Sequence, residues 1–126
     1  MLSETLFRVR RVDGLQTLQR RGEQGARELT THRLTLPAGG SGKFVSADEE
    51  TVVVLLEGRG LLEAGGHSWT VQRGNVFSDR PTALFLPPAV KLTASAESPF
   101  EAVLISTPAP PGGEPVLLTP ADVAVV

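Results

Sequence analysis

Short apolar segments separated by turn residues make up most of this chain. Glycine, proline and small polar residues recur about every eight to twelve positions, a spacing typical of an all-β sandwich or barrel. The apolar runs are too short for a membrane helix, which needs about 20 residues. Strands are predicted at Leu15–Gln19, Glu28–Leu36, Thr51–Leu56, Gly60–Glu63, Ser68–Gln72, Ala83–Leu86, Lys91–Ala94, Glu101–Ser106 and Pro115–Leu118. A helix is expected only as a single turn near Pro120–Val123.

Particular turn residues mark where these strands end. Two adjacent glycines allow positive φ at both central positions of a hairpin, so Gly65-Gly66 predicts a tight turn. Pro87-Pro88 removes two ladder donors and ends the strand before it. The run from Pro37 to Gly42 is expected not to continue a strand, and residues 106–126 are expected to form a C-terminal loop and tail.

The distribution of apolar residues within two strands indicates two packed sheets. In TVVVLLE, residues 51–57, both faces are apolar, which predicts a central strand that is covered on both sides. The segment ELTTHRLTL, residues 28–36, alternates instead, and His32 shares the face of Leu34 and Leu36. The sequence therefore predicts an all-β jelly-roll barrel.

Length and composition narrow the class of protein further. The 126 residues suggest one domain, residues 1–126, in which 1–13 are expected to be a mobile segment. The net charge of −2 offers no global field for nucleic acid or a membrane, and the chain contains no cysteine for disulfides, thiolate metal sites or a nucleophile. The N-terminus lacks the apolar core of a signal peptide. We expect a cytoplasmic protein with no nucleic-acid or membrane partner.

Arginine is concentrated at the start of the chain, where six arginines lie in the first 27 residues. Asp13 and Glu23 interrupt this run, and Phe7 is its only aromatic residue for stacking on a base. The pattern favours a solvated segment over a nucleic-acid-binding surface.

The glycine and proline spacing resembles the two metal-binding motifs of cupins, which are small double-sheet jelly rolls. The first motif is G-x5-H-x-H-x3/4-E-x6-G and the second is G-x5-P-x-G-x2-H-x3-N. Gly39 and Gly58 match the ends of the first, and Pro87 matches the proline of the second. The four ligand places hold Val45, Ala47, Thr51 and Leu92, none of which binds a divalent metal as imidazole or carboxylate does. The resemblance therefore implies a cupin barrel without metal or cofactor of its own.

A few residues remain as candidates for binding. Val45, Ala47, Thr51 and Leu92 are expected to line a cavity in the barrel mouth, together with His32, which we interpret as a hydrogen-bonded barrel histidine. Arg73 is the candidate contact for an acidic ligand, and a surface carboxylate is its alternative partner.

Other residues of chemical interest are given structural interpretations. His67 is expected in solvent at the hairpin, and Trp69 is expected to cover one barrel end. Asp48-Glu49-Glu50 is expected to be a solvated turn, although a one-residue insertion would move Glu50 onto the acid place of the first motif.

The order of several blocks resembles one family of enzymes. The blocks are Glu50–Gly58, Arg73–Pro87 and Thr107–Asp122, and they are similar to the N-terminal half of the 5-deoxy-glucuronate isomerases of inositol catabolism. These are relatives of the 4-deoxy-5-threo-hexosulose-uronate ketol-isomerases. The resemblance implies a two-cupin protein whose metal site, with a Pro-Pro-His-Lys-His-Asp stretch, belongs to the C-terminal cupin. That stretch is absent here, so the resemblance assigns no catalytic residue to this chain.

Two functional hypotheses stay open from the sequence, and whether the chain is an enzyme stays open with them. In the first, it contributes to carbohydrate metabolism as the metal-free wall of a sugar-acid isomerase, beside a metal-bearing cupin partner. In the second, it is a metal-free module that binds a small polar or acidic ligand, or that dimerises. Because a lone barrel leaves strand edges and a face uncovered, a homodimer is expected.

Overall fold

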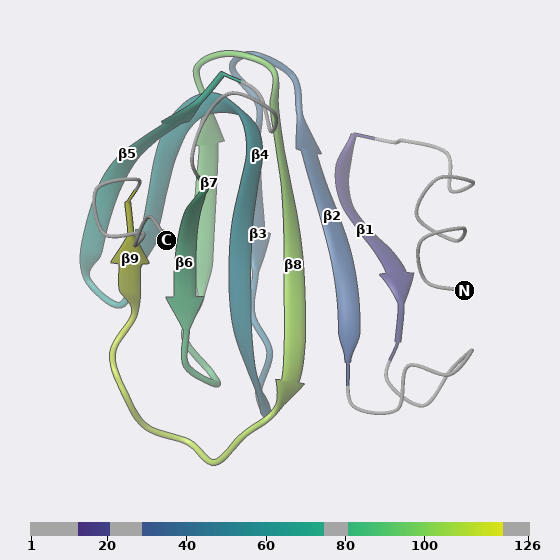
Figure 1. Ribbon diagram of the computed structural model, residues 1–126, viewed down its shortest axis with the longest axis vertical. Helices are drawn as coiled ribbons and strands as arrows, with labels where there is room; N and C mark the ends of the chain where they lie inside the picture. The colour runs from purple at the N-terminus through teal and green to yellow at the C-terminus, as the bar shows by residue number, and fades with distance from the viewer. Residues whose placement is uncertain (1–12, 21–28, 75–80, 120–126) are drawn as a thin grey trace, which may run out of the picture.

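Strands alone form the regular structure of the described part of the chain, which covers residues 13–20, 29–74 and 81–119 of this computed structural model (Figure 1). The strands are β1 (Gly14–Gln19), β2 (Thr30–Leu36), β3 (Ser41–Phe44), β4 (Glu49–Ala64), β5 (His67–Arg73), β6 (Thr82–Leu86), β7 (Leu92–Ala96), β8 (Phe100–Pro108) and β9 (Val116–Leu118). The all-β prediction is confirmed. No helix in these residues is long and apolar enough to cross a membrane. The single helical turn expected near Pro120–Val123 lies outside them.

The strands form two antiparallel layers that share β4. In the first layer the order is β1-β2-β8-β4-β6-β9, and in the second β7 pairs with β3 and β4 while β5 pairs with β4. Figure 1 shows the first layer in front, with β3 and β7 behind it. Strand β4 is therefore central, as the apolar run predicts.

The long strand β4 changes layer at a glycine corner. Its first half pairs with β6 and β8, its second half pairs with β5 and β7, and a register shift lies between Leu55 and Glu57. Gly58 has a φ of +106°, and a Cβ on Gly60 would meet the carbonyl oxygen of Ser95. The prediction of separate strands at 51–56 and 60–63 is wrong, because these glycines bend one strand instead of ending it.

The core lies between the layers. Leu34, Val53, Leu84 and Leu104 of the first layer face Leu62 and Ala94 of the second, and each is at most 3% exposed. Each large apolar side chain buried there contributes about 1.5–3 kcal/mol. The outer face of β4 differs from the prediction, because Val52 on this face is 40% exposed.

Turn predictions hold at the glycine hairpin and fail in part before β3. Gly65 and Gly66 have φ values of +56° and +81° between β4 and β5. The turn after Pro37 ends at Gly40, whose carbonyl accepts a hydrogen bond from the backbone N–H of Ala96. Because this contact aligns the next residues with β7, Ser41 and Gly42 lie in strand β3, which the sequence did not predict.

Candidate functional site

Polar side chains replace the apolar ones at the end of the barrel where β2 begins and β8 ends. Thr30, Ser106 and Thr51 are in register across β2, β8 and β4, and they are 8%, 0% and 1% exposed. The hydroxyl oxygens of Thr51 and Ser106 lie 2.7 Å apart and share a hydrogen bond. The next inward row contains Leu104 and Val53, so the polar row closes the apolar core at this end.

Glu49 places a buried carboxylate beside this row. It is 9% exposed, and its two oxygens accept hydrogen bonds from the hydroxyls of Thr30 and Ser46, each at 3.1 Å. The prediction that Asp48-Glu49-Glu50 is a solvated turn is therefore wrong for Glu49. Its alternation with the buried Thr51 and Val53 is the sequence signal that places Glu49 inward.

His32 stands at the same end and is half-buried. Its Nδ1 lies 3.0 Å from Oγ1 of Thr17, and its ring meets the ring of Phe44 edge-on with centroids 5.3 Å apart. Burial lowers the pKa of His32 below 6.5; the Glu49 carboxylate opposes this effect and Arg20 adds to it. The interpretation as a hydrogen-bonded barrel histidine is confirmed, and the imidazole is neutral at pH 7.

This lowered pKa predicts a pH-dependent stability. Between the folded pKa and the unfolded value of about 6.5, the unfolded chain binds more protons, so stability falls as the pH drops below about 6.5. His32→Asn is expected to flatten this fall in denaturant unfolding between about pH 7 and pH 5. The matched control is His67→Asn, the same substitution at an exposed histidine outside the polar end. Equal slopes for His32→Asn and wild type would contradict the assignment.

The structure separates the other predicted cavity residues. Thr51 and Leu92 point inward and are each 1% exposed, and Leu92 lies opposite Phe44 in the core. Val45 is 56% exposed, and Ala47 is also exposed, because both lie in the connection between β3 and β4. The described interior of this end is formed by hydroxyls, His32 and Glu49.

Arg73 lies at the β4 corner, away from the polar end. It is 8% exposed, and its guanidinium donates a hydrogen bond to the carbonyl oxygen of Leu55 at 2.7 Å. It borders an open depression of about 520 Å³ whose lining includes Glu57, Arg59 and Ser98. Arg59 pairs there with Glu97 at 3.0 Å. The described contact of Arg73 thus supports the main chain beside the register shift.

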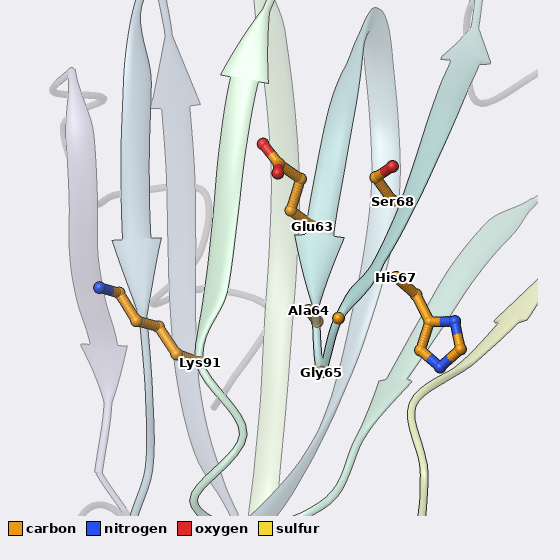
Figure 2. Close-up of a pocket in the computed structure, with 7 residues that line it drawn as sticks. Glu63, Ala64, Gly65, His67, Ser68 and Lys91 are labelled. Atoms are coloured by element: carbon orange, nitrogen blue, oxygen red, sulfur yellow. The ribbon is translucent and has the colours of Figure 1, made fainter.

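A second depression, of about 300 Å³, lies at the β4–β5 hairpin. Figure 2 shows that Lys91 and His67 point away from one another, so these two side chains do not converge on a common point. The His67 ring stacks on Trp69 with centroids 5.6 Å apart, and its Nε2 lies 3.8 Å from Oε2 of Glu114. His67 is exposed as predicted, and Trp69 packs against the core.

The donor set at the polar end does not fit a divalent metal. Within residues 13–20, 29–74 and 81–119, no three His, Cys, Asp or Glu side chains lie close enough together to hold an ion. A metal site of this kind needs three or four converging donors. Here one imidazole is bonded to Thr17 and one carboxylate is bonded to two hydroxyls.

Solved structures establish the fold. The cupin domain of Cnp3 from Schizosaccharomyces pombe is similar, with a TM-score of 0.61 and 10% identity over 82% of this chain and 72% of that one. A predicted oxalate decarboxylase from Thermotoga maritima has a TM-score of 0.58 and 15% identity, over 75% of this chain and 79% of that chain. The fold is therefore the cupin jelly roll, as expected.

The family follows from the sequence model. The model of the KduI/IolB family matches residues 7–126, and the chain belongs to this family. An IolB-like protein from Salmonella typhimurium LT2 is similar in structure, with a TM-score of 0.79 and 23% identity over 92% of this chain. The match covers 45% of that protein, so the present chain spans less than half of its length. A comparison with curated proteins found no match.

Proposed function

We propose that this chain is the metal-free cupin barrel of a cytoplasmic sugar-acid isomerase system that acts on 5-deoxy-glucuronate in inositol catabolism. In this proposal a partner cupin barrel supplies the metal and the groups that move the proton. The present chain contributes a wall of the active assembly and is inactive alone. Family membership supports the link to sugar-acid isomerases. The match to only 45% of the IolB-like protein supports a partner barrel in the active assembly.

The polar end of the barrel is the observation that carries the proposal. An aldose–ketose isomerisation moves a proton between adjacent carbons, and it needs a base within reach of that proton and an electrophile at the oxygens. The hydroxyls, the carboxylate and the imidazole described above are hydrogen-bonded to other side chains: Thr51 to Ser106, Glu49 to Thr30 and Ser46, and His32 to Thr17. These groups stabilise the barrel end, and they do not form a converging set of metal donors.

Assay of the isolated chain tests this proposal. Purified protein, supplied in turn with zinc, manganese, nickel and iron(II), is expected to give no turnover of 5-deoxy-glucuronate above the buffer rate. A full-length two-cupin member of the family, assayed in parallel, shows that the substrate and metals are competent. Robust turnover by the isolated chain, abolished by a chelator, would sink the proposal.

A second candidate function is a metal-free module that acts through association and takes no part in isomerisation. The outer face of the first layer favours it, because Val52, Ile105, Val116 and Leu118 are each between 38% and 50% exposed. A neighbouring reading frame that encodes a metal-bearing cupin favours the isomerase proposal. The absence of such a frame favours the module.

A further inference from the structure

We draw no further inference here: the strongest candidate, the apolar patch that Val52, Ile105, Val116 and Leu118 expose on the outer face of β9-β6-β4-β8, carries none, because nothing in the structure shows what covers it.

Discussion

Gly58→Ala is expected to cost this chain about 4 kcal/mol of folding free energy, which is at the exceptional end for a single substitution. The φ of +106° is strained for alanine and accounts for about 1–2 kcal/mol. A Cβ would also lie 2.5 Å from the carbonyl oxygen of Pro99 and 2.7 Å from Cα of Phe100. Both are backbone atoms, and Phe100 is only 2% exposed in the core, so the clash moves the strand itself.

Thermal unfolding measures this effect against a matched glycine. Gly66 also has a positive φ, +81°, but a Cβ there meets nothing within 4 Å, so Gly66→Ala carries the backbone strain without the clash. We expect the midpoint to fall by roughly 15 °C for Gly58→Ala and by only a few degrees for Gly66→Ala. Equal losses in the two variants would contradict the close approach at the β4 corner.

The same corner shows where sequence reasoning about the fold stops. A glycine within an apolar run can end a strand, or it can let another segment of backbone pass close by. Whether Gly58 and Gly60 end the strand or bend it depends on Pro99 and Ser95, which follow these glycines by about 40 residues in the chain. The hairpin at Gly65-Gly66 was predictable, because its signal is entirely local.

Alternation predicted part of the candidate site and missed the rest. It places Thr51 inward with Val53, and the same period-two pattern extended backward places Glu49 inward. The acidic triplet is predicted to be solvated because of its charge, and that prediction misses the buried carboxylate of Glu49. The interior positions for Val45 and Ala47 came from motif spacing, and the structure exposes both residues. The apolar run of β4 correctly predicts a central strand, although Val52 on its outer face is 40% exposed.

The absence of a bound metal is the second expected result of large effect. At the polar end, Nδ1 of His32 is within 3.0 Å of Thr17, and the Glu49 carboxylate accepts two hydroxyl hydrogen bonds. Binding an ion there would break these hydrogen bonds. The ion would gain only two protein donors, the His32 imidazole and the Glu49 carboxylate, which is fewer than the three or four that a stable site requires. Thr51 and Leu92 occupy two of the expected ligand places and offer no imidazole or carboxylate.

Elemental analysis of the chain, purified without a histidine tag and dialysed after exposure to zinc, manganese, nickel and iron(II), tests the central claim most directly. We expect far less than one equivalent of any of these metals per chain. Close to one equivalent of any of them, with density for the ion inside the barrel in a crystal of the same preparation, would contradict it.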